Sequence, residues 1–158
     1  MRVKDFMNRD VETCEAGDDL AKAAMIMWRQ DCGIVPVVED GGKVLGVVTD
    51  RDICIAAATQ HCPPERLSVG HVMARQPAST SAEEDIETAL KRMGTHRVRR
   101  LPVVDPEGRL AGMLSIADVI EGMHDGKAQD LTSHVMHAIS EICIRTPDVE
   151  RAAGANGR

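Results

Sequence analysis

At 158 residues, the chain is long enough for one compact domain or two very small ones. Phe6 and Trp28 are its two aromatic residues, so a core must be built from aliphatic side chains, alanine and the nine methionines. The net charge of −6 and the scarcity of aromatic platforms argue against nucleic acid as a partner. The apolar runs are far shorter than the ~20 residues of a membrane span, and the first residues lack an apolar signal segment, so we expect a cytoplasmic protein with no membrane partner.

The chain contains an internal repeat, because residues 3–54 align with residues 69–120 without a gap. Several aligned positions are identical: Met7/Met73, Ala16/Ala82, Asp19/Asp85, Ala23/Ala89, Met27/Met93, Gly42/Gly108, Gly46/Gly112, Asp52/Asp118, and Pro-Val-Val at 36–38 and 102–104. An ungapped repeat of this length indicates two copies of one structural unit.

Each copy predicts a helix, two short strands and a second helix. In the first copy the predicted elements cover residues 18–30, 34–39, 44–48 and 49–59, with a tight turn at Gly41-Gly42 between the strands. In the second copy they cover residues 83–94, 101–105, 110–114 and 115–123, with a turn at 106–108. Ser81 and Glu84 have the spacing of a capping box for the helix over 83–94.

These elements define the expected domain organisation. The first repeat is expected over residues 1–59, a connector containing Pro63-Pro64 over 60–68, and the second repeat over 69–124. Residues 125–144 contain an amphipathic helix, predicted over 127–144, which either caps its own module or packs on a partner. The tail, 145–158, is expected to be disordered. One copy alone buries too little surface, so we expect an α/β (α+β) fold in which two repeats pack sheet to sheet with pseudo-twofold symmetry.

A hydroxyl and a carboxylate recur with the same spacing in the two copies. Thr49 and Asp52, like Ser115 and Asp118, stand where a predicted strand ends and a helix begins. In a structural explanation, the hydroxyls are helix N-caps and the aspartates are first-turn acids favoured by the helix dipole. In a functional one, the hydroxyl and the helix amides receive a phosphate and the aspartate binds ribose hydroxyls. The two explanations are compatible.

The second copy carries a basic run, residues 91–100, that the first copy lacks. Lys91 and Arg92 are expected near a helix C-terminus, where cations are favoured. Arg97, Arg99 and Arg100 lie at the entry to the next strand, and Arg99 or Arg100 is a candidate phosphate ligand.

Metal and redox sites are weakly indicated. His134 and His137 would share a helix face, but without nearby acids in the sequence they form an incomplete zinc site. The number of cysteines, five, is odd, and none of them forms a C-x-x-C motif. This pattern favours reduced, mostly buried thiols over a disulfide framework, and the alternative is a redox-linked pair. No nucleophile elbow, Walker loop or zinc-protease motif occurs, so we expect a protein that is not an enzyme.

The combined motif, Leu/Val-Pro-Val-Val-Glu/Asp followed by a glycine turn and Gly-x-x-Thr/Ser-x-x-Asp, resembles the CBS domain, the cystathionine-β-synthase-like repeat. Two tandem copies resemble a Bateman module, which in that family binds adenosine-type ligands such as AMP, ADP and ATP between the repeats. The resemblance implies ribose contacts by Asp52 and Asp118, and phosphate contacts by Thr49, Ser115, Arg99 and Arg100. For the adenine pocket it implies Thr13, Ile34 and Val48 in one copy and Ser79, Arg100 and Leu114 in the other.

The same resemblance implies a regulatory module whose cofactor-like ligand is an adenine nucleotide, with Mg²⁺ accompanying a triphosphate left open. We expect a homodimer that signals to an unknown protein effector by a shift between conformations. The alternative is a stress-related or redox-linked interaction scaffold of the same fold that binds no nucleotide.

Overall fold

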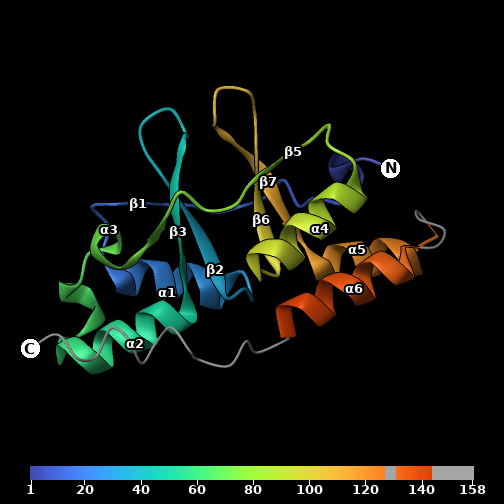
Figure 1. The fold of residues 1–158 in the computed structure, drawn as a ribbon. Helices are drawn as coiled ribbons and strands as arrows, with labels where there is room; N and C mark the ends of the chain where they lie inside the picture. The colour runs from blue at the N-terminus through green and yellow to red at the C-terminus, as the bar shows by residue number, and fades with distance from the viewer. Residues whose placement is uncertain (127–130, 144–158) are drawn as a thin grey trace, which may run out of the picture.

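The computed structural model describes residues 1–126 and 131–143, and it contains two sheets flanked by helices (Figure 1). The first half contains a 3₁₀ turn and the elements β1 (Cys14–Glu15), α1 (Leu20–Arg29), β2 (Ile34–Val38), β3 (Val44–Thr49) and α2 (Asp50–Gln60). The second half contains α3 (Val69–Val72), β4 (Ala74–Arg75), β5 (Thr80–Ser81), α4 (Ile86–His96), β6 (Arg100–Val104), β7 (Leu110–Ser115), α5 (Ile116–His124) and α6 (Thr132–Cys143). The 3₁₀ turns cover Val3–Asp5 and Pro64–Arg66.

The two sheets have matching topologies. The first has the strand order β1-β2-β3-β4 and the second has the order β5-β6-β7. In each, a short parallel strand precedes an antiparallel hairpin. The hairpin register pairs Ile34 with Thr49 and Arg100 with Ser115, so the entry to one strand lies beside the hydroxyl at the end of the next. The predicted strands are confirmed, with ends that move by one residue.

The expected capping box at Ser81 and Glu84 is wrong. Helix α4 begins at Ile86, and its N-cap is Asp85, whose side chain accepts a hydrogen bond from the Glu87 amide at 3.0 Å. Glu84 is engaged elsewhere, because its carboxylate accepts two hydrogen bonds from the Arg92 guanidinium, at 2.6 and 2.7 Å. The bidentate partner therefore holds the side chain that the capping box would have used.

The segment that leads each repeat packs on the core of the other repeat. Val3, Phe6 and Met7 belong to the core built around β6 and β7, whereas Val69 and Met73 belong to the core built around β2 and β3. The backbone follows the same exchange, since Asn8 bridges to Met113 of β7 and β4 pairs with β3. The residues that pack into one core are therefore not the same as the residues of one sequence repeat.

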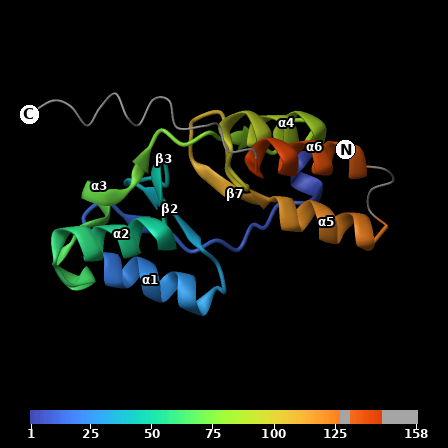
Figure 2. The ribbon, with the colours of Figure 1, turned by 60° about the horizontal axis from the view of Figure 1, so that its bottom comes forward.

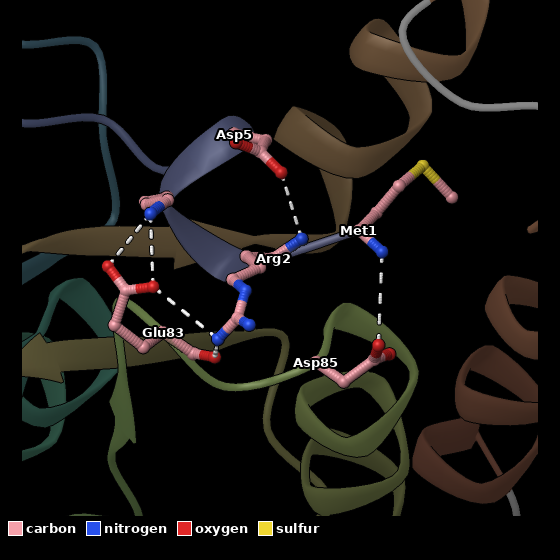
Figure 3. A network of polar contacts seen from close by, with 6 residues as sticks. Met1, Arg2, Asp5, Glu83 and Asp85 are labelled. Atoms are coloured by element: carbon pink, nitrogen blue, oxygen red, sulfur yellow. Dashed lines mark hydrogen bonds and ion pairs between the residues drawn. The ribbon is translucent and has the colours of Figure 1, made fainter.

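Ion pairs fix the first exchanged segment to the second repeat (Figure 3). Lys4 Nζ lies 2.9 Å from Glu83 Oε1, and Arg2 Nη1 lies 3.4 Å from Glu83 Oε2. The Met1 amino group lies 3.8 Å from the Asp85 carboxylate. These side chains are substantially exposed, so the burial of Val3 beneath them contributes more to the attachment than the charges do.

The exchange explains the repeated glycine that precedes each hydroxyl. A Cβ at Gly46 would lie 2.6 Å from the Ala74 carbonyl oxygen, and one at Gly112 would collide with the Asn8 carbonyl oxygen. Only glycine lets the exchanged backbone approach these strands so closely.

The two hairpins meet about a pseudo-twofold axis. The Val44 amide donates to the Gly108 carbonyl at 3.0 Å, and its repeat counterpart, the Leu110 amide, donates to the Gly42 carbonyl at 2.9 Å. The two hydrogen bonds exchange places when the repeats are interchanged. The expected pair of repeats with pseudo-twofold symmetry is confirmed.

Helix α6 breaks this symmetry, because it covers the helices of the second repeat alone (Figure 2). It lies along α4 and touches α5, and its residues Val135 and Ala138 are buried there together with the preceding Leu131. The helix predicted over 127–144 therefore caps its own module, within the part that the structure describes. On the first repeat, by contrast, α1 and α2 leave apolar side chains in solvent: Met25, Trp28 and Ile55.

Candidate functional site

A cavity of about 250 Å³ lies between the two repeats. From the first repeat it is lined by Asn8, Asp10, Val11 and Glu12. Residues at the end of α1 and the start of β2 complete this side, including Gln30, Asp31 and Ile34. From the second repeat it is lined by Arg100, Met113, Ser115, Ala117 and Asp118. Four of the candidate site residues thus meet in one cavity: Ile34, Arg100, Ser115 and Asp118.

Asp118 is fixed in this cavity by a reciprocal helix cap. The Ser115 amide donates to Asp118 Oδ2 at 2.6 Å, and the Asp118 amide donates to Ser115 Oγ at 3.1 Å. The structural explanation of the hydroxyl-carboxylate pair is therefore confirmed here. Within the described residues, Asp118 Oδ1 and the Ser115 hydroxyl proton have no protein partner, so both can still bind a ligand.

Thr49 and Asp52 form the same cap at the start of α2. Asp52 Oδ2 accepts hydrogen bonds from the Thr49 amide at 3.0 Å and from its hydroxyl at 2.7 Å. The hydroxyl of Thr49 is thus a donor to its own cap, which the Ser115 hydroxyl is not. Neither residue lines the cavity that contains Asp118. The two copies of the motif are geometrically alike but are not in the same site.

Arg99 and Arg100 lie at the entry to β6. Arg100 is half-buried and lines the cavity with Asp118, while Arg99 is exposed and lines a neighbouring cavity. Among the described residues, neither guanidinium has a carboxylate within 4.0 Å. Lys91 and Arg92 were expected near the C-terminus of their helix. Helix α4 continues to His96, so both residues lie inside the helix instead.

The residues proposed to contact adenine are scattered. The side chains of Val48 and Leu114 are completely buried in the two cores, so only their backbone could reach a ligand. Thr13 follows the lining residue Glu12 and is half-buried. The Ser79 carbonyl accepts a hydrogen bond from Arg92 Nη1 at 2.7 Å. Of this set, Ile34 and Arg100 line the cavity.

Three acidic residues of the first repeat line the cavity and were missed in the sequence: Asp10, Glu12 and Asp31. Glu12 accepts hydrogen bonds from Gln30 Nε2 at 2.6 Å and from Arg29 Nη2 at 2.7 Å. The hydrogen bond from Gln30, with the nearby Arg29 cation, lowers the pKa of Glu12 below its usual value. Together with Asp118, these residues give the cavity an acidic lining, in which Arg100 is the cation.

A second cavity, of about 410 Å³, adjoins the first and is lined on one side by α6. Its lining residues are Arg99, Arg100, Ser115, Ile116, Ala117, Ile120, Ile139, Ile142 and Cys143. Arg100, Ser115 and Ala117 line both cavities, so the two are contiguous. The repeat pattern could not predict that α6 lines this cavity, because α6 has no counterpart in the first copy.

The histidines do not form a metal centre in residues 1–126 and 131–143, where no group of three or more His, Cys, Asp or Glu could hold an ion. His134 does have an acidic neighbour, contrary to its sequence context, since its Nε2 lies 3.3 Å from Glu87 Oε2. All five cysteines are free. In the same described ranges, no helix has both the length and the hydropathy that a membrane span requires.

The family model for the CBS domain matches the chain twice, over residues 3–58 and 69–125. Two curated relatives align along nearly their whole length. YhcV, a CBS domain-containing protein of Bacillus subtilis, is 31% identical over 136 residues, which are 85% of this chain and 95% of that protein. Hypoxic response protein 1 of Mycobacterium tuberculosis is 30% identical over 141 residues, which are 89% and 92%.

Solved structures show the same fold. Hypoxic Response Protein I, crystallised with two coordinated zinc ions, superposes with a TM-score of 0.70 at 30% identity and covers 77% of this chain and 98% of its own. The CBS domain pair of MJ0100, in complex with 5′-methylthioadenosine and S-adenosyl-L-methionine, has a TM-score of 0.70 at 23% identity and covers 78% and 99%. CBSX2 of Arabidopsis thaliana, in complex with AMP, has a TM-score of 0.69 at 24% identity and covers 80% and 98%.

The same pair of repeats also occurs within an enzyme. This chain matches 24% of the length of homoserine O-acetyltransferase from Methanohalophilus mahii, at 32% identity over 123 residues. The repeated Gly-x-x-Thr/Ser-x-x-Asp caps, the exchanged leading segments and the family match over more than half of the residues agree with one another. The chain belongs to the CBS domain family, as a tandem pair of CBS repeats.

Proposed function

We propose that this protein is a regulatory module that binds an adenosine-type nucleotide between its two repeats. The observation that carries the proposal is the shared cavity, in which Ile34 of one repeat faces Arg100, Ser115 and Asp118 of the other. A ligand held by both repeats would favour one arrangement of them, and this is how binding would be reported to an effector. The fold likeness to CBS pairs that hold AMP or S-adenosylmethionine supports the same ligand class.

The charges favour one orientation of the nucleotide. Ribose hydroxyls and the adenine amino group are hydrogen-bond donors, and the acidic lining of the first cavity, including Asp31 and Asp118, offers acceptors to them. A phosphate would be repelled there and attracted by Arg99 and Arg100 at the other end. We therefore assign the ribose to Asp118 and the phosphate to Ser115, Arg99 and Arg100, with Ile34 against the base.

A second, weaker cleft is part of the proposal. Pseudo-twofold symmetry relates Asp118 and Ser115 to Asp52 and Thr49, so the repeat counterpart of the nucleotide site would use these residues together with Ser79. The Thr49 hydroxyl donates to Asp52, which leaves it less available to a phosphate than the Ser115 hydroxyl. We expect one strong site at Asp118 and one weak site at Asp52.

The direct test is a thermal-shift and calorimetric titration of the purified protein with adenosine, AMP, ADP, ATP with and without Mg²⁺, and S-adenosylmethionine. A ligand at ~100 times its dissociation constant adds about 2.7 kcal/mol, which is roughly 5–10 °C for a chain of this size. An upward shift with AMP that leaves the nucleotide chemically intact supports a sensor. A flat response to every adenosine ligand contradicts the proposal.

The alternative function is a redox-linked interaction scaffold, and the placement of two thiols favours it. Cys32 and Cys54 line the same surface groove beside Trp28, between α1 and α2. Cys32 is half-buried and donates to the Ile34 carbonyl at 3.3 Å, while Cys54 is exposed. If oxidation of these thiols abolishes nucleotide binding, the protein has both functions. If the thiols are oxidised and the protein binds no nucleotide in either state, the scaffold is favoured.

Cys14 is expected to take no part in such chemistry. Burial in the first core raises the pKa of the Cys14 thiol to about 11, so at neutral pH the reactive thiolate is almost absent. In native protein treated with iodoacetamide, mass spectrometry should find Cys54 and Cys143 alkylated and Cys14 unmodified. Cys14 should react after denaturation, which is the control. Alkylation of native Cys14 as fast as Cys54 would show that this core opens readily.

We also propose that the protein is a homodimer, formed through the uncovered α1–α2 face of the first repeat. Trp28, with 84% of its surface exposed, and Met25 and Ile55 give this face an apolar centre. On the second repeat, α6 packs against α4 and α5, and the exposed apolar side chains there, Ile120 and Met136, are less exposed than Trp28.

A further inference from the structure

The cavity beneath α6 has two chemically different sides. One side carries the hydroxyl of Ser115 and the guanidiniums of Arg99 and Arg100, which have no ion-pair partner among the described residues. The other side is apolar and comes from Ile120 of α5 and from Ile139 and Ile142 of α6. Helix α6 lies beyond the second family match, which ends at residue 125. This wall is therefore a feature of this chain rather than of the repeat.

The cavity lies where the 5′ substituent of a nucleoside bound by Asp118 would extend. Arg100, Ser115 and Ala117 separate the two cavities, and Asp118 lines the first of them only. A ribose held by Asp118 can thus extend its 5′ substituent past Arg100 into the cavity under α6. Among the described residues, the lining of this second cavity contains two cations and no carboxylate.

We propose that α6 forms the wall of a 5′ subsite that accepts a single phosphate, so that the module selects a nucleoside monophosphate over a triphosphate. The inference rests on the proposed nucleotide function and adds to it the number of phosphate groups that the ligand carries. Two guanidiniums balance the charge of one phosphate group. The β- and γ-phosphates would lie against Ile139 and Ile142, where they would lose hydration and, among the described lining residues, find no further cation.

The experiment changes the charge of the α6 wall at Ile142, which is half-buried, in the variants Ile142→Glu and Ile142→Lys. Met136, 60% exposed on the same helix and absent from the cavity lining, provides the matched controls Met136→Glu and Met136→Lys. Dissociation constants for adenosine, AMP and ATP are measured by calorimetry with the full chain, and circular dichroism checks that each variant remains folded.

For the unmodified chain we expect AMP to bind at least about tenfold more tightly than ATP. Ile142→Glu should weaken AMP by about tenfold or more, because the new carboxylate pairs with the arginines, and it should leave adenosine unchanged. Ile142→Lys should strengthen ATP by a similar factor, and the Met136 variants should change neither ratio.

The inference is overturned if ATP binds the unmodified chain as tightly as AMP. It is also overturned if both Ile142 variants keep the AMP-to-adenosine ratio of the unmodified chain while remaining folded. In either case the proposed nucleotide function stands. If adenosine and AMP both fail to bind the unmodified chain, it is the proposed function that fails.

Discussion

Replacing Asp118 with alanine is expected to weaken AMP binding by about 10- to 100-fold, since hydrogen bonds from the ribose hydroxyls to a carboxylate are worth ~1.5–3 kcal/mol. Asp118 lines the cavity between the repeats, and its Oδ2 is held by the Ser115 amide at 2.6 Å. The helix cap thus orients the carboxylate before the ligand arrives. Calorimetric titration of Asp118→Ala with AMP measures the loss.

Asp52→Ala is the matched control for this variant. Asp52 occupies the same position in the cap of α2 and accepts from the Thr49 amide at 3.0 Å, so both variants lose the same kind of helix cap. Their melting temperatures should fall by similar amounts. The tight AMP site should survive Asp52→Ala and be lost in Asp118→Ala. Unchanged affinity in both variants would show that the ribose assignments are wrong.

Local patterns predicted much of this fold. The helix-strand-strand-helix order follows from hydrophobic periodicity and from turn residues such as Gly42 and Gly108, whose positive φ angles of 81° and 82° the hairpins require. The N-cap roles of Thr49 and Ser115 follow from a hydroxyl three residues before an aspartate at a strand end. Each of these signals operates within a few residues along the chain.

The features that the sequence concealed are long-range. Val3 and Met7 pack on the second repeat because the leading segments exchange, and nothing in their own neighbourhood indicates which core receives them. Asp85 replaces the expected cap because Glu84 is bound by Arg92, eight residues away. The acidic lining from Glu12 and Asp31 comes from parts of the first repeat that the packing of the two repeats brings to Asp118. Charge complementarity within the site therefore required the tertiary arrangement.

Substitution of Trp28 by aspartate is expected to convert the proposed homodimer into a monomer. A tryptophan contributes ~150–250 Å² of buried surface to a contact, and a twofold interface buries two copies of it. Trp28 is 84% exposed in the single chain, so the substitution removes an intermolecular contact without disturbing the core. Sedimentation velocity over a range of protein concentrations should show a dimer for the unmodified chain and a monomer for Trp28→Asp.

Met136→Asp is the control for the introduced charge, because Met136 is also exposed, at 60%, but lies on α6 of the other repeat. This variant should remain dimeric, and both variants should remain folded, because neither side chain lies in a core. A dimer that persists in Trp28→Asp would place the interface away from α1 and α2.

If the monomeric variant still binds AMP, the cavity between the repeats is complete within one chain. Association then affects how binding is signalled to an effector rather than whether the ligand binds. If AMP binding is lost together with the dimer, a second copy must contribute to the site, and the assignment of Asp118 and Arg100 to a single-chain cavity would have to be revised.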